Sequence, residues 1–98
     1  MAIQSYCTDG TRDIAESVNS RDARRTLPVE LFRAARRRLA ALDAMTSLTE
    51  LSIFPDWRLE QLKGDRAGQY SIRINDQYRI CFEWDGVHVE NAEVTDYH

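Results

Sequence analysis

Residues 63–82, KGDRAGQYSIRINDQYRICF, combine cationic side chains with hydrophobic residues that alternate as they do in a β-strand. The cations of this segment are Lys63, Arg66, Arg73 and Arg79. A strand that only fills a core does not need this charge, whereas guanidinium groups bind phosphate and carboxylate groups through paired N–H donors. The segment therefore indicates an anion-binding surface. A general bias towards arginine is the alternative explanation, because Lys63 is the only lysine among 13 cations.

The alternation predicts two strands that share one hydrophobic face, which packs against helices. The members of this face are Tyr70, Ile72, Ile74, Tyr78, Ile80 and Phe82. Both strands bury these residues only if a three-residue connection, Asn75-Asp76-Gln77, places Ile74 opposite Tyr78. A two-residue connection would turn one strand over. The same register places Arg73 directly opposite Arg79 on the other face, which we expect to be exposed.

Two like charges that face each other across a β-ladder destabilise it. The pair of Arg73 and Arg79 therefore predicts an anion nearby. This anion is either a bound ligand or a carboxylate of the chain itself, and solvation of both guanidinium groups is the remaining reading. The carboxylates that the sequence offers for this role are Glu83, Glu93 and Asp65.

The last predicted strand changes the parity of its hydrophobic residues between Val89 and Ala92. A β-bulge near Glu90 or Asn91 would reconcile the two halves of the strand. Beyond such a bulge, the residues that share a face with the two arginines are Glu93, Thr95 and Tyr97. A tyrosine beside cations can stack on a base or transfer a proton.

The elements that must position these residues follow from hydrophobic periodicity, caps and turns. They predict one α+β domain over residues 1–98, with an N-terminal strand and two helices packed on an antiparallel sheet. In chain order we first expect a strand over 3–7 and a helix over 11–19 capped by Thr8 or Asp9. A polar connection over 19–26 then leads to a long helix from Pro28 to Met45 and to a helical turn with a Ser47–Glu50 capping box. The two strands described above follow, and a last strand comes after an Asp85-Gly86 turn.

Charge is segregated along the chain, although the net charge is only -3. Residues 21–38 contain seven arginines, whereas residues 83–98 contain five acidic residues and no cation. A net negative charge argues against indiscriminate coating of nucleic acid, so any RNA contact must use local patches. Exposed arginines on the long helix, Arg33, Arg36 and Arg37, serve a partner or are simply solvated.

Several classes of protein and site are disfavoured. No hydrophobic run approaches the roughly 20 residues of a membrane span. The first residues lack the features of a signal peptide, so we expect a cytoplasmic protein with free thiols at Cys7 and Cys81. His88 and His98 have no neighbouring ligands at metal-site spacing, so we predict no metal and no cofactor.

The segment LKGDRAGQYSIRINDQYRICFEW, followed by the chain end DYH, resembles the HigB branch of the RelE superfamily, which includes the GraT-type toxins. The resemblance is specific over residues 58–84 and 94–98 and is limited to the order of elements over residues 1–57. It implies a RelE-like, microbial-RNase-type fold and a toxin of a bacterial type II toxin–antitoxin module. It further implies metal-independent cleavage of mRNA in the ribosomal A site and silencing by a helix-turn-helix, HigA-like antitoxin.

The resemblance also assigns roles position by position. Lys63, Arg73 and Arg79 match basic residues that hold and neutralise phosphate, and Arg66 ranks second because Gly64-Asp65-Arg66 is also a plausible structured turn. The terminal Asp96, Tyr97 and His98 match the acid–base and base-stacking triplet of the family. Alternation along the strand predicts that Asp96 and His98 face away from Tyr97 unless the terminus is irregular.

One position departs from the HigB pattern. Glu60 stands where some HigB toxins have a catalytic histidine, as in the GraT-like subset. A carboxylate can act as a base but cannot supply positive charge as an imidazolium does, so we expect slow cleavage. Glu60 could instead pair with Arg58 or Lys63 and only tune charge. Two other functions therefore stay open: an attenuated toxin that mainly binds its antitoxin, and a gyrase poison like those of the ParE branch.

Overall fold

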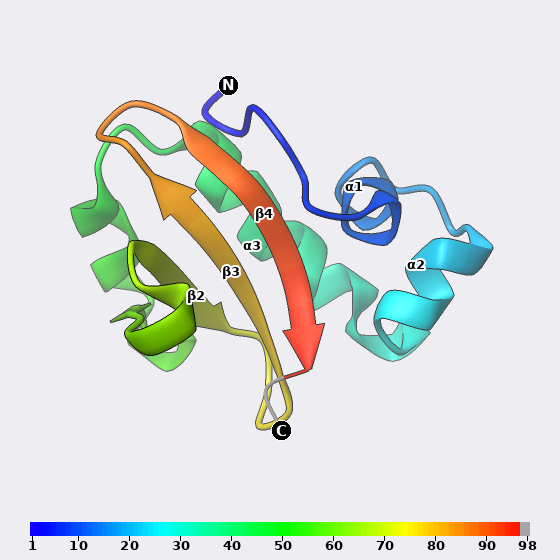
Figure 1. Cartoon of the computed structure of the whole chain (residues 1–98). Helices are drawn as coiled ribbons and strands as arrows, with labels where there is room; N and C mark the ends of the chain where they lie inside the picture. The colour runs from blue at the N-terminus through cyan, green and yellow to red at the C-terminus, as the bar shows by residue number, and fades with distance from the viewer. Residues whose placement is uncertain (97–98) are drawn as a thin grey trace.

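The sheet of this chain is antiparallel throughout and its strands follow the order of the sequence. In the computed structural model, which describes residues 1–96, the strands are β1 (Glu60–Gln61), β2 (Gln69–Arg73), β3 (Tyr78–Trp84) and β4 (Val89–Asp96), in the order β1-β2-β3-β4. Helix α3 (Phe32–Ala44) lies behind the sheet in Figure 1, and the opposite face is turned to the viewer. This arrangement confirms the predicted α+β class.

Helices α1 (Asp9–Ala15) and α2 (Arg21–Thr26) pack beside the sheet (Figure 1). Thr8 caps α1, as predicted, through a hydrogen bond from the Thr11 N–H. The predicted polar connection over 19–26 was wrong, because Ser20 caps α2 by accepting from the Ala23 N–H and Ala23 is buried. Short 3₁₀ helices complete the chain: η1 (Val29–Leu31), η2 (Leu48–Ile53), η3 (Pro55–Trp57) and η4 (Gly64–Arg66).

The core lies between α3 and the sheet. Ile72, Ile80 and Phe82 are fully buried on the sheet side, and Leu39 and Leu42 of α3 belong to the same core cluster. This burial confirms the predicted hydrophobic face of β2 and β3. The Ser47–Glu50 capping box is also present, at the start of η2. In the part of the chain that the structure describes, no helix is long and apolar enough to cross a membrane.

The register of the meander agrees with the prediction. Arg73 pairs with Arg79 across the β2–β3 ladder. Between β3 and β4 the pairing shifts near Asn91, whose φ of 54° is left-handed, a conformation that asparagine tolerates better than most residues. The predicted bulge is therefore confirmed, and Thr95 lies opposite Arg79.

The first residues differ in detail from a continuous strand. Residues 2–7 run parallel to the outer edge of β4 and form isolated bridges at Ile3–Val89 and Tyr6–Ala92. The bulge of β4 lies between these two bridges, so a regular ladder cannot extend from one to the other.

A buried hydrogen bond joins α1 to β4. The N–H of Val94 donates to Thr11 Oγ1 at 3.0 Å, and the Thr11 residue has no exposed surface. Since β4 is the last strand of the sheet, its outward N–H groups need partners other than a strand. The carbonyls of Ala2 and Ser5 accept hydrogen bonds from the N–H groups of Val89 and Ala92, and Thr11 Oγ1 accepts one from Val94. This bond therefore fixes the end of β4 that lies beside the arginines.

Replacing Thr11 by valine, which keeps the volume but removes the acceptor, should lower the free energy of unfolding by about 1–3 kcal/mol. It should also speed hydrogen exchange at the Val94 amide, whereas Thr11→Ser should keep that amide protected. Denaturant unfolding and amide exchange measure the two effects. Unchanged protection of Val94 in Thr11→Val would show that the hydrogen bond does not hold β4.

Candidate functional site

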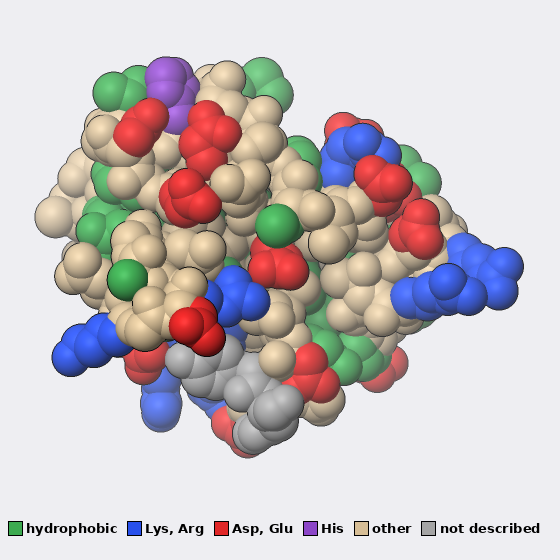
Figure 2. Space-filling view, viewed as in Figure 1, with side chains coloured by type: hydrophobic (Ala, Val, Ile, Leu, Met, Phe, Trp, Pro, Cys, Tyr) green, Lys and Arg blue, Asp and Glu red, His purple; other side chains and the backbone are tan. Residues whose placement is uncertain are grey.

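The sheet face turned away from α3 carries the charged residues that the sequence singled out. We call this surface the arginine face and define it by Glu60 on β1, Ser71 and Arg73 on β2, Arg79 and Cys81 on β3, and Glu93 and Thr95 on β4. Lys and Arg side chains lie among Asp and Glu side chains on this side of the molecule (Figure 2). The register therefore brings Glu60, Arg73 and Arg79 onto one surface.

Arg79 is buried, with 7% of its surface exposed, which corrects the expectation of an exposed arginine pair. Its Nε donates to Ser71 Oγ and its Nη2 donates to the carbonyl oxygen of Arg58, both at 2.8 Å. The same Nη2 lies 3.8 Å from Glu60 Oε2. The segment from η3 to β1 supplies these last two groups and covers the guanidinium.

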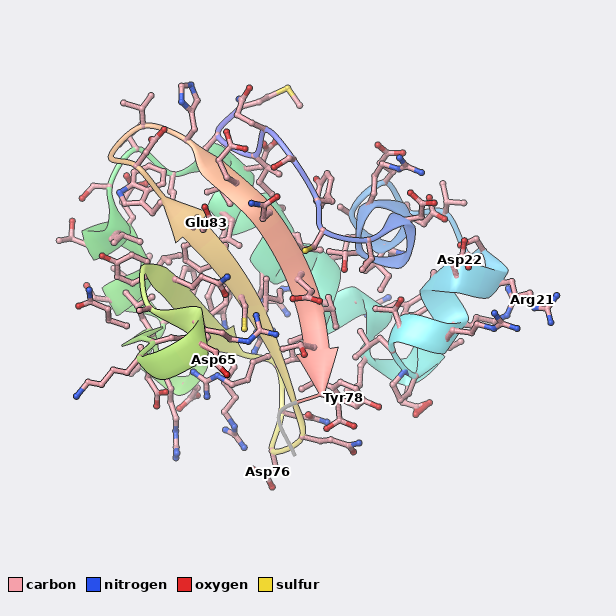
Figure 3. The ribbon with its side chains drawn as sticks, in the orientation of Figure 1. Arg21, Asp22, Asp65, Asp76, Tyr78 and Glu83 are labelled. Atoms are coloured by element: carbon pink, nitrogen blue, oxygen red, sulfur yellow. The ribbon has the colours of Figure 1, made fainter. Side chains whose placement is uncertain are left out.

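Arg73, at the end of β2, forms an ion pair with Asp76 in the β2–β3 connection. Figure 3 shows Asp76 at the tip of that connection. The backbone of Arg73 is also fixed, because its carbonyl accepts a hydrogen bond of 2.7 Å from Arg38 Nε on α3. The Arg38 guanidinium lies 4.8 Å from the centre of the Trp57 ring, and burial lowers the pKa of Arg38.

The like charges of Arg73 and Arg79 are thus balanced by carboxylates of the chain. Within residues 1–96, the ion pairs join Arg73 to Asp76 and Arg79 to Glu60, rather than to the Glu83, Glu93 or Asp65 that the sequence suggested. Among the described residues Glu60 pairs with Arg79 rather than with Arg58 or Lys63, the partners that the alternative reading of Glu60 named. An incoming anion would have to compete with these internal partners.

Arg66 on η4 covers the middle of the arginine face. Its Nη1 lies 3.3 Å from Glu93 Oε1 and donates to Gln69 Oε1 at 3.0 Å. Beneath it, Cys81 has only 1% of its surface exposed, and burial raises the pKa of its thiol. A raised pKa leaves less thiolate at neutral pH, so Cys81 is not suited to be a nucleophile.

The remaining predicted residues lie at the margins. Lys63 is exposed at the start of η4. Asp96 pairs with Tyr78, on the opposite parity from Arg79 and Thr95, and accepts a hydrogen bond from Gln77 Nε2 at 2.9 Å. Its placement agrees with the alternation predicted for β4. The predicted residues Tyr97 and His98 lie outside the described residues.

The sequence analysis did not identify the two groups that accept hydrogen bonds from Arg79, namely Ser71 Oγ and the Arg58 carbonyl. Ser71 could have been found, because it shares the parity of Arg73 on β2. The role of the Arg58 carbonyl could not have been found, because it depends on a left-handed backbone with a φ of 49° in an irregular segment. Within residues 1–96, no group of three or more His, Cys, Asp or Glu side chains could hold a metal ion.

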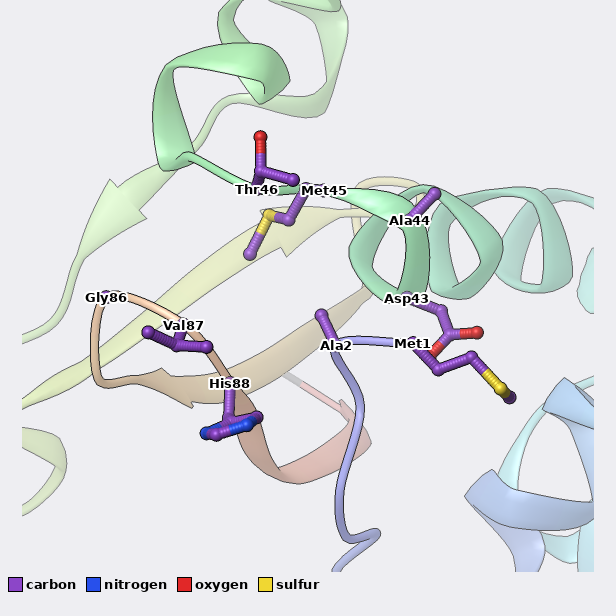
Figure 4. A pocket seen from close by; sticks show the side chains of 9 residues that line it. All are labelled: Met1, Ala2, Asp43, Ala44, Met45, Thr46, Gly86, Val87 and His88. Carbon is purple, nitrogen blue, oxygen red and sulfur yellow. The ribbon is translucent and has the colours of Figure 1, made fainter.

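A pocket of about 400 Å³ lies elsewhere, between the end of α3, the first residues and the β3–β4 hairpin (Figure 4). Its lining includes Met1, Asp43, Met45, Val87 and His88. None of the residues predicted from sequence to bind RNA or to act in catalysis lines it.

Chemically, the arginine face carries donors of the kind that recognise anions. Two guanidinium groups on adjacent strands present planar sets of N–H donors, which match the oxygens of a phosphate. Fixed donors stabilise charge that develops during phosphate chemistry without first having to reorganise.

Comparison with solved structures identifies the same fold. The YoeB–YefM complex from Staphylococcus aureus has a TM-score of 0.60 at 18% sequence identity, and the match covers 100% of this chain and 99% of the other. The YoeB/ParE toxin from Agrobacterium tumefaciens has a TM-score of 0.56 at 16% identity, with 100% of both chains covered. At these sequence identities the comparison shows a shared fold and nothing further.

Relatives found by sequence identify the family as well as the fold. Toxin HigB-1 of Vibrio cholerae serotype O1 is 44% identical over 64 residues, which cover 64% of this chain and 67% of that protein. An uncharacterized protein of Haemophilus influenzae is 30% identical over 70 residues, 71% of this chain and 69% of the other. The family model for the HigB-like toxin, described as the RelE-like toxin of the type II toxin–antitoxin system HigB, matches residues 12–98. The chain therefore belongs to the HigB-like toxins of the RelE superfamily.

Proposed function

We propose that this toxin is a ribosome-dependent mRNA endonuclease that inhibits translation and growth in the cytoplasm. In this proposal the arginine face receives mRNA in the ribosomal A site, and a HigA-like, helix-turn-helix antitoxin silences the toxin. The observation that carries the proposal is the pairing of Arg73 with Arg79 across the β2–β3 ladder, on the face opposite the core. A phosphodiester is an anion that such a pair fits.

The reaction has simple requirements. The 2′-oxygen of the RNA forms a bond to the adjacent phosphorus while the bond from phosphorus to the 5′-oxygen breaks, leaving a 2′,3′-cyclic phosphate and a 5′-hydroxyl. One group must take the proton of the 2′-hydroxyl, and another must supply a proton to the leaving oxygen. Cations must neutralise the charge on the phosphorane.

We assign charge neutralisation to Arg73 and Arg79, with Lys63 and Arg66 along the path of the RNA backbone. The Arg79 guanidinium is already fixed at two nitrogens, which favours it for contact with the reacting phosphate. Proton transfer and base stacking are assigned to Asp96, Tyr97 and His98 on the family resemblance. Because Asp96 pairs with Tyr78 on the other parity of β4, alternation favours Tyr97 over Asp96 for this role, and His98 would join Tyr97 only if the strand ends irregularly.

Glu60 is expected to weaken both phosphate binding and catalysis at this site. Its carboxylate lies 3.8 Å from Arg79 Nη2, where it offers the guanidinium an internal alternative to phosphate. It can also act as a base towards the 2′-hydroxyl, but it cannot donate positive charge to the phosphorane. We therefore propose slow cleavage and mild toxicity.

The pairing of Glu60 with Arg79 also favours a second candidate function. If the carboxylate holds the cation against phosphate at all times, the protein acts mainly as an antitoxin-binding module. A gyrase poison is the third candidate, but the KGDRAGQ segment and terminal DYH resemble HigB toxins rather than the ParE branch.

Arg79→Ala and Tyr97→Ala should each abolish growth inhibition, because loss of a fixed cation or a proton-transferring group costs on the order of 10²-fold or more in such sites. Growth after induced expression measures the effect, and circular dichroism checks that each variant folds. Arg12→Ala, an exposed arginine on α1 paired with Asp9, is the matched control and should stay toxic. Undiminished toxicity in both site variants would remove the arginine face from the mechanism.

Glu60→Gln should lower the KM for a ribosome-bound message, because it removes the carboxylate that competes for Arg79. Glu60→His should in addition raise kcat by roughly tenfold or more, since an imidazole can transfer protons near neutral pH. Single-turnover cleavage by the wild type and the two variants separates the effects. Equal rates and equal KM values in all three proteins would leave position 60 no part in binding or chemistry.

The antitoxin prediction concerns the reading frame beside this one, which should encode a small helix-turn-helix protein that copurifies with the toxin. Coexpression with a tag on the toxin alone is the measurement. Arg33→Glu and Arg37→Glu, two exposed positions of α3, should weaken the complex if this helix contributes to the contact. Failure of the neighbouring protein to bind would count against a toxin–antitoxin pair.

A further inference from the structure

Among the groups that hold Arg79 are two hydrogen-bond acceptors from different parts of the chain. Ser71 Oγ, on β2, accepts from Nε, and the Arg58 carbonyl, at the end of η3, accepts from Nη2. A guanidinium is planar, so hydrogen bonds from two of its nitrogens fix both its position and the orientation of its plane. Losing either acceptor removes one of the constraints on the orientation of that plane.

The Arg58 carbonyl is itself rigidly placed. Arg58 adopts a left-handed backbone with a φ of 49°, an uncommon conformation for a residue other than glycine or asparagine. Its N–H donates to the Pro55 carbonyl at 3.2 Å, which closes η3. The preceding Trp57 is buried, stacks on Phe54 with 3.9 Å between ring centroids, and lies against the Arg38 guanidinium.

Ser71 is equally well fixed. It has no exposed surface, and it pairs with Glu60 on one side and Cys81 on the other in the middle of the sheet. A buried hydroxyl at this position adds little to packing beyond what an alanine would provide. Its specific contribution is the hydrogen bond of 2.8 Å to Arg79.

We infer that Ser71, acting with the backbone carbonyl of Arg58, is a positioning residue that sets the Arg79 guanidinium in place before RNA binds. The inference rests on the proposed function in one respect, namely that Arg79 contacts the reacting phosphate. A cation that is already oriented stabilises the phosphorane without reorganising, so the loss of Ser71 should reduce kcat more than it changes KM.

The test follows the Arg79 side chain directly by nuclear magnetic resonance. In protein labelled with ¹⁵N-arginine, the Arg79 Nε–Hε signal is assigned by its disappearance in Arg79→Lys, and its exchange with water is measured. Ser71→Ala should speed this exchange at least about tenfold, because a hydrogen bond from a charged donor is lost. Ser71→Thr, which keeps the hydroxyl, should preserve the protection.

The matched control is Ile72→Val, which removes one methylene from the helix-facing side of the same strand and destabilises the fold without touching Arg79. It should leave the Arg79 exchange unchanged. Equal exchange in the wild type and Ser71→Ala, or an equal acceleration in Ile72→Val, would overturn the inference.

Cleavage of a ribosome-bound message then tests whether the orientation of Arg79 affects kcat. Ser71→Ala should lower kcat about tenfold with little change in KM, and Ser71→Thr should restore it. Faster exchange in Ser71→Ala with an unchanged kcat would also overturn the role of Ser71. If the wild type cleaves no message, the proposed function fails, and the exchange experiment still decides whether Ser71 positions Arg79.

Discussion

The register of β2 against β3 is the constraint on which both faces of this protein depend. Because successive side chains of a strand point to opposite faces, the pairing that buries Ile72 and Ile80 against α3 also sets Arg73 opposite Arg79. A shift of this register by one residue would turn one strand over, so that its arginine would enter the core and its isoleucine would face away from α3. Core packing therefore fixes the geometry of the charged face.

Placing two guanidinium groups opposite each other is costly, and the chain compensates for this cost locally. Arg73 pairs with Asp76 and Arg79 lies beside Glu60, while Arg66 pairs with Glu93. The result is a surface that is close to neutral at the point where a polyanion is expected to bind, in agreement with the net charge of -3. Such a surface would bind RNA by exchanging internal carboxylates for phosphate, which distinguishes it from a simple basic patch.

Much of this arrangement could be predicted from the sequence because it follows from the twofold period of strands. The opposition of Arg73 and Arg79, the three-residue connection and the bulge near Asn91 all follow from which residues must be buried. The burial of Arg79 and its hydrogen bond to the Arg58 carbonyl could not be predicted in this way. They depend on the path of the irregular segment between α3 and β2, where no periodicity constrains the backbone. Helix α2 was missed because its short sequence reads as polar, although Ser20 carries the signal for its start.

The proposed function requires that the arginine face support attack of a 2′-hydroxyl on the adjacent phosphate of a ribosome-bound message. The most direct measurement is the chemistry of the ends produced when the purified toxin, free of antitoxin, is mixed with programmed ribosomes. We expect fragments with a 2′,3′-cyclic phosphate on one side of the cut and a 5′-hydroxyl on the other, formed only when ribosomes are present. An intact message, or fragments with 3′-hydroxyl and 5′-phosphate ends, would contradict it.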